Sequence, residues 1–181
     1  MKEVVQKAYN NWQTDLDKTL PAMKQIPKIF FDDKWQITSI EKNKNIILNK
    51  LDTKSGIDWI AENENHIITI AARIQFGVNY RTFTIRKERK TGTKTELEKR
   101  KEAIKNGFLY PLYTCQCYFT NNYNFLGGAI IKTVDLYKSL ENANVFEKKS
   151  DNKFIHVSFY DLQDKGYKIK ILEGNPFFKI A

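Results

Sequence analysis

Cysteine, histidine and proline are scarce in this sequence, which has two cysteines, two histidines and four prolines among 181 residues. Cys115 and Cys117 are two residues apart in a run with the composition of a β-strand, so their side chains point to the same face and a disulfide between them would be strained. We therefore predict reduced, half-buried thiols. His66 and His156, without a C-x-x-C motif, provide too few ligands for a structural zinc site and are too scattered for a Ser-His-Asp catalytic set.

Long apolar runs and nucleotide-binding motifs are missing as well. No run approaches the ~18 apolar residues that cross a bilayer, and the N-terminal residues lack the apolar stretch and cleavage pattern of a secretory signal. We therefore expect an intracellular, cytoplasmic protein without a membrane partner. Neither G-x-x-x-x-G-K-[ST] nor G-x-G-x-x-G after a strand occurs, so the sequence does not indicate a nucleotide cofactor.

The sequence does have enough apolar residues for a core, together with a concentrated positive charge. Hydrophobic residues make up 41% and aromatic residues 13%, and the length predicts a single domain, 1–181. The formal net charge is +9, and the segment from Arg81 to Lys105 carries ten basic and four acidic side chains, a net +6. Such a segment is typical of polyanion binding, although a solvated helix face and loop in a lysine-rich protein would have the same composition.

Hydrophobic periodicity predicts an α/β (α+β) fold with a mixed β-sheet flanked by helices. The first elements are expected to be an N-terminal helix or arm over 1–20, closed by Pro21, and a second helix from Asp33, paired with Gln36 as a cap, to about Lys50. The next elements are strands at 57–60, 66–76 and 80–86, the third paired to the second, then a helix from Thr95 to Asn106 capped by Gly107 and a strand at 112–119.

Residues 121–181 are predicted to add strands to this core. We expect a strand at 125–132, a helix at 135–142 and strands at 154–161 and 167–172, with 147–153 as a polar loop prone to nicking or disorder. In the strand at 66–76, alternation puts Ile68, Ile70, Ala72, Ile74 and Phe76 on one face and Ala71, Arg73 and Gln75 on the other. That strand is therefore predicted to be central, with one polar side.

The order helix, three strands, helix, strand over 33–120, with Asp58 followed by a polar-faced strand, resembles the αβββαβ core of the PD-(D/E)XK (restriction-endonuclease-like) nuclease superfamily. The resemblance implies a fold in which an aspartate and a D/E-x-K pair hold Mg²⁺ and orient an attacking water, and in which a helix glutamate often completes the site. Asp58 matches the family's aspartate, and Glu41 is placed to match the helix glutamate. The D/E-x-K pair has no counterpart, because the strand reads Ala71-Ala72-Arg73 and Arg73-Ile74-Gln75.

This departure predicts a metal site that is weakened or lost. Removing one carboxylate removes a charge and a ligand, unless Asp52 or Gln75 substitutes, so we expect no cofactor, or Mg²⁺ if the protein is active. The candidate catalytic residues are Asp58, Glu41 and Gln75, and the candidate metal ligands are Asp58 and Asp52. Arg73 and Gln75 could instead contact phosphates and base edges, and a buried Asp58–Arg73 ion pair that only braces the sheet explains them equally well.

The sequence thus predicts a nucleic-acid-binding protein with a nuclease-like core, with DNA favoured over RNA. The loop Lys87–Lys94 before a capped helix start offers positive charge and backbone N–H groups to a phosphate. The candidate nucleic-acid-binding residues are Arg73, Arg81, Arg86, Lys87, Arg89, Lys90, Lys94, Lys99 and Arg100. Two alternatives stay open: a phage-type inhibitor of a bacterial defence system, similar to an anti-CRISPR that acts on a nucleic-acid-bound effector, and an active Mg²⁺-dependent nuclease.

Overall fold

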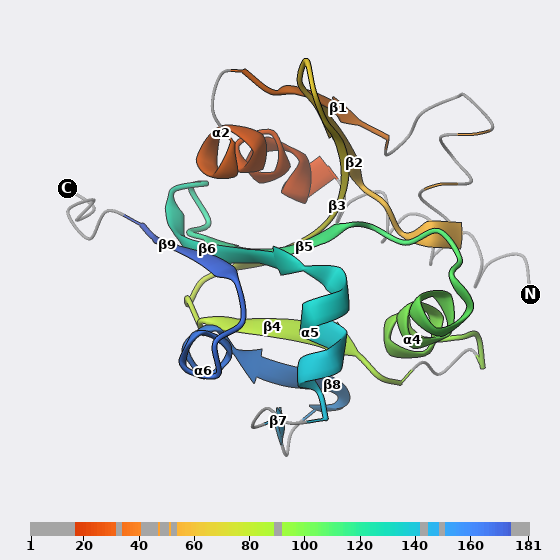
Figure 1. Cartoon of the computed structure of the whole chain (residues 1–181). Helices are drawn as coiled ribbons and strands as arrows, with labels where there is room; N and C mark the ends of the chain where they lie inside the picture. The colour runs from red at the N-terminus through yellow and green to blue at the C-terminus, as the bar shows by residue number, and fades with distance from the viewer. Residues whose placement is uncertain are drawn as a thin grey trace, which may run out of the picture.

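The computed structural model describes residues 17–31, 34–40, 47, 51, 54–88, 92–141, 145–148 and 151–174, which form a mixed α/β fold (Figure 1). A six-stranded sheet has the order β1-β2-β3-β5-β6-β9, and a three-stranded sheet has the order β4-β8-β7. The strands of the large sheet are β1 (Gln36–Ser39), β2 (Trp59–Glu62), β3 (Ile67–Phe76), β5 (Tyr113–Phe119), β6 (Phe125–Lys132) and β9 (Ile169–Glu173). The small sheet contains β4 (Thr82–Arg86), β7 (Val145–Lys148) and β8 (Asp151–Ser158), and the helices given bounds are α2 (Ile26–Phe30), α4 (Glu96–Asn106), α5 (Thr133–Ser139) and α6 (Phe159–Asp164).

Pairing in the large sheet is antiparallel except between β3 and β5, which run parallel. Parallel neighbours need a crossover connection, and the chain between these two strands contains β4 and α4. The predicted strands at 57–60, 66–76 and 80–86, the helix at 95–106 and the strand at 112–119 correspond to β2, β3, β4, α4 and β5, but β4 lies outside the large sheet and the additional strand β1 lies within the predicted helix at 33–50.

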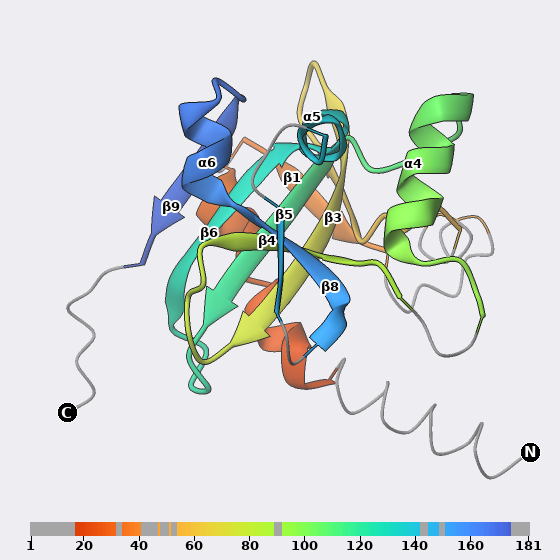
Figure 2. The same ribbon diagram turned by 90° about the horizontal axis from the view of Figure 1, so that it is seen from below.

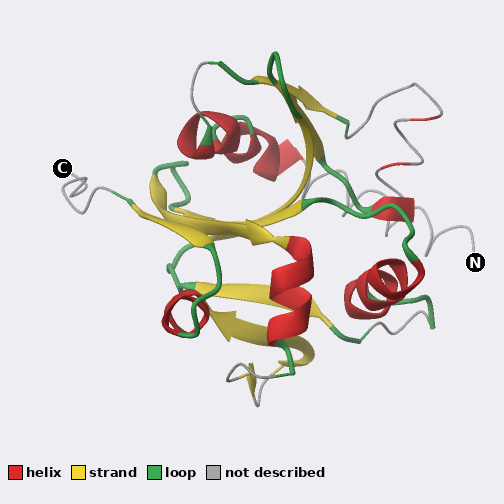
Figure 3. Cartoon of the chain, in the orientation of Figure 1, coloured by secondary structure: helices red, strands yellow, loops and turns green. Residues whose placement is uncertain are grey.

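The large sheet separates two apolar cores (Figures 2 and 3). On one face, α2 and the residues just before it pack Ala22, Met23 and Ile26 against strand residues such as Ile70 and Cys115. On the other face lie the small sheet, α5 and α6, whose core includes buried residues of β4, β6, β8 and both helices: Phe83, Ile85, Ile131, Leu136, Val157, Phe159 and Leu162. Both faces of the sheet are therefore covered, which explains the apolar runs in β5 and β6.

The alternation predicted for β3 is confirmed. Ile68, Ala72, Ile74 and Phe76 pack against the α2 core, while Arg73 reaches toward α4 on the opposite side and hydrogen bonds to Glu96. Successive side chains of a strand point to opposite faces, so this single strand supplies an apolar surface to one core and a polar surface to the other.

The predicted second helix is wrong at its start. Gln36–Ser39 is strand β1, paired with Trp59–Glu62 of β2, whereas residues 47, 51, 54 and 55 are helical. The burial of Gln36–Ser39 alternates with the two-residue period of a strand, and sheet pairing outweighs the local Asp-x-x-Gln capping signal. Asp33 lies outside the described residues. The predicted strand at 57–60 exists but begins at Trp59, after Asp58.

Strand β4 exists as predicted, but its predicted partner is wrong. It pairs with β8 in the small sheet, not with β3. The chain leaves the large sheet through Gly77, at φ 103°, and Arg81, at φ 54°. Between them the Asn79 amide donates to the Leu126 carbonyl of β6 at 3.1 Å. This hydrogen bond holds the chain against β6, so the chain crosses the sheet instead of returning along β3. The Thr82–Ile85 segment that follows is buried.

Helix α4 confirms the predicted caps. The Thr95 hydroxyl accepts from the Glu98 backbone N–H, and the Glu98 carboxylate accepts from the Thr95 backbone N–H. Gly107 ends the helix in the left-handed conformation, at φ 66°. Because both caps depend on local residues, the sequence alone was sufficient to find them.

The C-terminal elements agree with the prediction in part. The strands at 125–132 and 167–172 are confirmed as β6 and β9, and the short helix as α5, which begins two residues early. The predicted loop at 147–153 is wrong, since β7 extends to Lys148 and β8 starts at Asp151. The predicted strand at 154–161 ends at Ser158, which caps helix α6 by accepting from the Asp161 N–H.

The predicted end of the N-terminal helix at Pro21 is also wrong, because residues 17–23 are helical and residues 1–16 lie outside the described part of the chain. A proline removes one helical hydrogen bond, and burial of Ala22, Met23 and Ile26 in the α2 core offsets that loss. Cys115 and Cys117 are free, as predicted, and fully buried rather than half-buried, with burial raising the pKa of the Cys115 thiol. None of the described helices is long and apolar enough to cross a membrane.

Candidate functional site

A cavity of about 420 Å³ lies where β3 and β5 meet β4 and α4, on the side of the large sheet opposite α2. We call it the Asp58 cavity. Its polar lining residues come from the turn before β2, from β3, β4, α4 and β5: Lys54, Ser55, Asp58, Arg73, Thr84, Glu96, Lys99, Arg100, Thr114 and Gln116. Residues far apart in the sequence, including the predicted pair Asp58 and Arg73, thus line one hollow.

Asp58 is held on both of its neighbouring strands. Its carboxylate Oδ2 accepts from the Ala72 N–H at 2.6 Å, and its own N–H donates to the Ile70 carbonyl at 2.9 Å. Its carbonyl accepts from the Ile40 N–H at 3.0 Å. These three bonds hold Asp58, which lines the cavity, between β3 and the residue that follows β1.

Arg100 of α4 stabilises the turn that leads to Asp58. It is only 7% exposed, and its guanidinium donates to the carbonyls of Ser55 and Gly56. Gly56 has φ 57°, and a Cβ there would lie 2.5 Å from Arg100 Nη2, so the close approach depends on glycine. Burial lowers the pKa of Arg100. This arginine, predicted to bind nucleic acid, has these donors committed to the protein's own backbone.

Arg73 forms its ion pair with Glu96 of α4, with Nη2 and Oε2 2.6 Å apart. The same oxygen accepts from the Arg86 N–H at 3.4 Å. The guanidinium groups of Arg73 and Arg86 lie 5.4 Å and 5.0 Å from the centre of the Phe154 ring. The ion pair therefore connects β3 to α4. It differs from the predicted ion pair between Asp58 and Arg73, and Glu96 was not among the candidate residues.

Gln75 belongs to a buried hydrogen-bond chain between the two sheets. Its Oε1 accepts from Gln116 Nε2 at 3.3 Å, and Gln116 Oε1 accepts from the Thr84 N–H at 3.3 Å. The Thr84 hydroxyl lies 3.3 Å from His156 Nδ1. Gln75 does not line the Asp58 cavity, so the structure does not bring it together with Asp58. Glu41 and Asp52 lie outside the described residues.

The basic segment from Arg81 to Lys105 is spread over the molecule. Arg81 pairs with Glu173 at 3.2 Å, beside α6 and β9, and Lys94 pairs with Glu102. Arg86 and the half-buried Lys87 lie at the other end of β4, next to the loop that leads to α4. Arg89 and Lys90 lie outside the described residues. Its described side chains therefore do not form one contiguous patch.

Lysines of α4 and of the segments beside it nevertheless line three hollows around this helix. Lys54 and Lys99 line the Asp58 cavity and also an adjoining hollow of about 380 Å³, and Lys101, Lys105 and Lys138 line a third hollow of about 220 Å³ between α4 and α5. We call these five side chains the α4 basic surface. Of these five, only Lys99 was among the candidate nucleic-acid-binding residues. Lys101 and Lys105 belong to the basic segment but were not singled out, and Lys54 and Lys138 join this surface only through the packing of the fold.

Metal binding has limited support from the described residues. Asp58 and Glu96 are the carboxylates that line the Asp58 cavity, and no group of three or more metal-binding side chains was found among the residues that the structure describes. Both carboxylates already accept hydrogen bonds from the protein.

Comparisons with protein-family models, curated proteins and solved structures give no significant match to this chain. Its function must therefore be inferred from the chemistry of its own surfaces.

Proposed function

We propose that this protein binds nucleic acid through the α4 basic surface and the mouth of the Asp58 cavity, on a nuclease-like core whose metal-dependent catalysis is weak or lost. The order of strands β2, β3 and β4, helix α4 and strand β5 supports the nuclease-like interpretation. Order alone is a weak argument for function, so the proposal depends on the charged groups.

The observation that carries the proposal is a set of five lysines that line three hollows around α4, two of which share Lys54 and Lys99. Lys54, Lys101, Lys105 and Lys138 are exposed and Lys99 is half-buried. Besides the Asp58 cavity, the other two hollows have one acidic lining residue each. These are Glu102, which is paired with Lys94, and Glu141. Lysine side chains presented on one surface neutralise phosphates and release counterions, which favours binding to a polyanion.

The absence of a carboxylate from the matching positions of β3 supports binding over cleavage. Ala71 and Ala72 have no ligand atoms in their side chains, and the arginine that follows them is neutralised by Glu96. A second candidate, a Mg²⁺-dependent nuclease, is favoured by one observation: the Asp58 and Glu96 carboxylates line the same cavity. We assign no step to a metal here.

The test is a gel-shift titration against single-stranded and double-stranded DNA and RNA, at low and high salt, with and without Mg²⁺. The test variant is Lys99→Glu, Lys101→Glu, Lys105→Glu. Its matched control is Lys24→Glu, Lys28→Glu, Lys34→Glu, which changes the net charge equally at exposed positions on the α2 side. We expect the α4 variant to weaken DNA binding at least about tenfold and the control to weaken it much less.

Equal losses of DNA affinity in the two variants would show that net charge alone drives binding. No gel shift of the wild type at low salt would overturn the proposal and favour a protein target, as in the inhibitor alternative. Cleavage that needs Mg²⁺ and disappears in Asp58→Ala would establish the nuclease candidate instead. Circular dichroism of each variant confirms that the fold is retained.

A further inference from the structure

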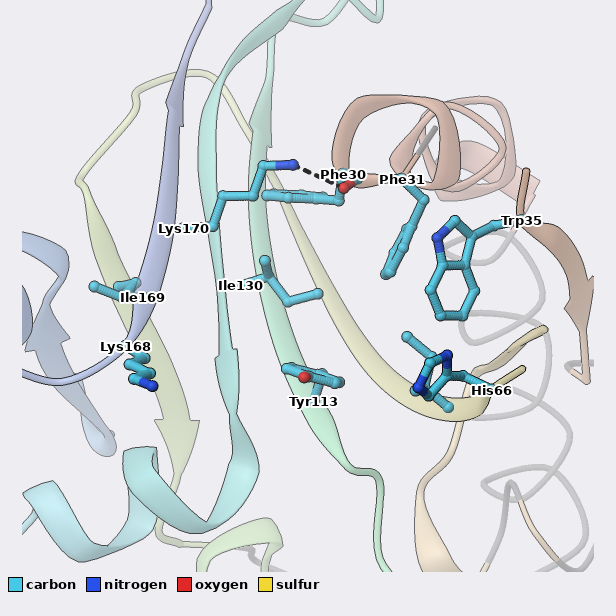
Figure 4. A pocket seen from close by; sticks show the side chains of 10 residues that line it. Phe30, Phe31, Trp35, His66, Tyr113, Ile130, Lys168, Ile169 and Lys170 are labelled. Atoms are coloured by element: carbon cyan, nitrogen blue, oxygen red, sulfur yellow. Dashed lines mark hydrogen bonds between the residues drawn. The ribbon is translucent and has the colours of Figure 1, made fainter. Parts of the chain in front are cut away.

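A second cavity, of about 660 Å³, lies on the α2 side of the large sheet (Figure 4). We call it the Trp35 cavity. It is lined by residues at the beginnings of three strands, including Ile68 of β3, Tyr113 of β5 and Ile169 of β9, and by Phe30 and Phe31 at the end of α2. Helix α2 is only five residues long, so it covers only part of this face of the sheet and the cavity lies beyond its last turn.

The walls of the Trp35 cavity are mainly aromatic. The Phe31 and Trp35 rings have centroids 5.5 Å apart with an interplanar angle of 57°. In the view of Figure 4, the Trp35 ring lies above His66, and Ile130 and Tyr113 lie to their left on the strands of the sheet. Phe31, Trp35, Ile68 and Tyr113 are all only half-buried, so their apolar surfaces face an open hollow. Concave apolar surfaces of this size are typical of small-molecule sites.

The position of His66 is fixed by a turn rather than by packing. The Asn63 side-chain oxygen accepts from the backbone N–H groups of Asn65 and His66, at 3.0 Å and 2.8 Å. The Asn63 N–H donates to the His66 carbonyl at 2.9 Å. The turn between β2 and β3 is therefore closed on itself and presents His66 at the mouth of the cavity.

Three side chains with nitrogen atoms line the cavity, and carboxylates are absent from its described lining residues. Lys168, Lys170 and His66 line it, and none of the described lining residues is Asp or Glu. Lys170 is opposite Ile130 in the sheet, so its side chain projects on the α2 side, where Nζ donates to the Phe30 carbonyl at 2.9 Å. Lys168 comes directly before this edge strand, lines the cavity and is exposed.

We propose that the Trp35 cavity binds a small organic anion with a flat, apolar body. The flat body packs among Phe31, Trp35 and Tyr113, because offset and edge-to-face ring contacts are favourable, and the anionic group is directed to Lys168 and His66. This site is on the opposite side of the large sheet from the α4 basic surface, so the proposal goes beyond nucleic-acid binding and does not depend on it.

The test is calorimetric titration of the full chain with 2-naphthoate and with 2-naphthalenemethanol, a neutral compound with the same ring system. We expect naphthoate to bind at one site, at least about fivefold more tightly than the alcohol. Lys168→Gln should remove this preference and leave the affinity for the alcohol unchanged. Ile68→Trp, which fills the cavity, should abolish binding of both compounds, whereas Lys105→Gln, on α4, should change neither.

Three results would overturn the proposal: no binding of naphthoate, equal affinity for the anion and the alcohol, or naphthoate binding that survives Ile68→Trp. Equal affinity would mean that the lysines only protect the exposed edge of β9. Concentration-dependent self-association that Ile68→Trp abolishes would also overturn it, by identifying a second copy as the occupant. Lys168→Gln changes an exposed residue and keeps the test valid if Ile68→Trp fails to fold. Gel shifts with Lys168→Gln should match the wild type, which separates this result from the proposed function.

Discussion

The two sides of the large sheet differ in the side chains that strand β3 presents to them, apolar on one side and polar on the other. On the α2 side, β3 contributes Ile68, Ala72 and Ile74 to an apolar core that opens into the Trp35 cavity. On the α4 side, the alternate residues Arg73 and Gln75 form an ion pair and a hydrogen-bond chain. Polar residues on one face of a strand therefore indicate where distant polar partners pack, and not necessarily where a ligand binds.

The largest effect is expected on the α4 side, from Arg100→Met. Removing this buried guanidinium leaves the Ser55 and Gly56 carbonyls without their partner and releases the turn before Asp58. We expect the free energy of unfolding to fall by about 2–4 kcal/mol. The matched control is the exposed neighbour Lys101→Met, which should change it by less than about 0.5 kcal/mol. Urea denaturation measures both, and similar effects of the two substitutions would contradict this role of Arg100.

Two adjacent residues of β5 allow the contributions of the two sides to stability to be compared. Gln116 is 1% exposed and bonded on the α4 side, while Cys117 is fully buried in the α2 core. We expect Gln116→Leu to destabilise the protein by about 1–3 kcal/mol, because the buried Thr84 N–H loses its acceptor. Cys117→Ala should cost less, about 1 kcal/mol, because no hydrogen bond to the backbone is lost. A larger loss for Cys117→Ala would show that the polar chain contributes little.

The ion pair between Arg73 and Glu96 should contribute less than either change. Both side chains are partly exposed, at 29% and 26%, so solvent screens the pair. A double-mutant cycle with Arg73→Gln and Glu96→Gln should give a coupling free energy of about 0.5–1 kcal/mol that decreases with added salt. A coupling near zero would show that the pair does not tie β3 to α4.

The smallest effect concerns the cap of α4. The Thr95 backbone N–H and hydroxyl both donate to Glu98, and these bonds lower the pKa of its carboxyl. Its contribution to stability is therefore fully present above the pKa of the unfolded state and is lost as the pH falls through the lower pKa of the folded state. The stability difference between wild type and Glu98→Gln should shrink below about pH 4. Denaturation midpoints measured across this range would contradict the expectation if the difference stayed constant.

Local signals in the sequence predicted the parts of the fold that depend on neighbouring residues. The capping box at Thr95, the left-handed Gly107 and the alternation of β3 were all visible. The partner of β4 was not, because it is set by the Asn79 anchor on β6 and by β8, more than 60 residues later in the chain. The Asp-x-x-Gln pattern near β1 predicted a helix start that is wrong, because pairing with β2 makes this segment a strand.

The candidate site was predictable only in outline. Asp58 and Arg73 were identified, and both line one cavity. Glu96 was missed because nothing in its local sequence separates an ion-pair partner from an ordinary first-turn glutamate. The aromatic residues of the Trp35 cavity come from the end of α2, from the segment before β1, from the turn before β3 and from the start of β5, and no sequence spacing links them.

The salt dependence of DNA binding tests the central claim, nucleic-acid binding through the α4 basic surface, most directly. Dissociation constants of the wild type, the Lys99/Lys101/Lys105→Glu variant and the Lys24/Lys28/Lys34→Glu control are measured by fluorescence anisotropy at several salt concentrations. We predict a slope of log affinity against log salt of about −3 to −5 for the wild type and the control, and a slope smaller in magnitude by about 2 or more for the α4 variant. Identical slopes for all three proteins, or no salt dependence in the wild type, would contradict it.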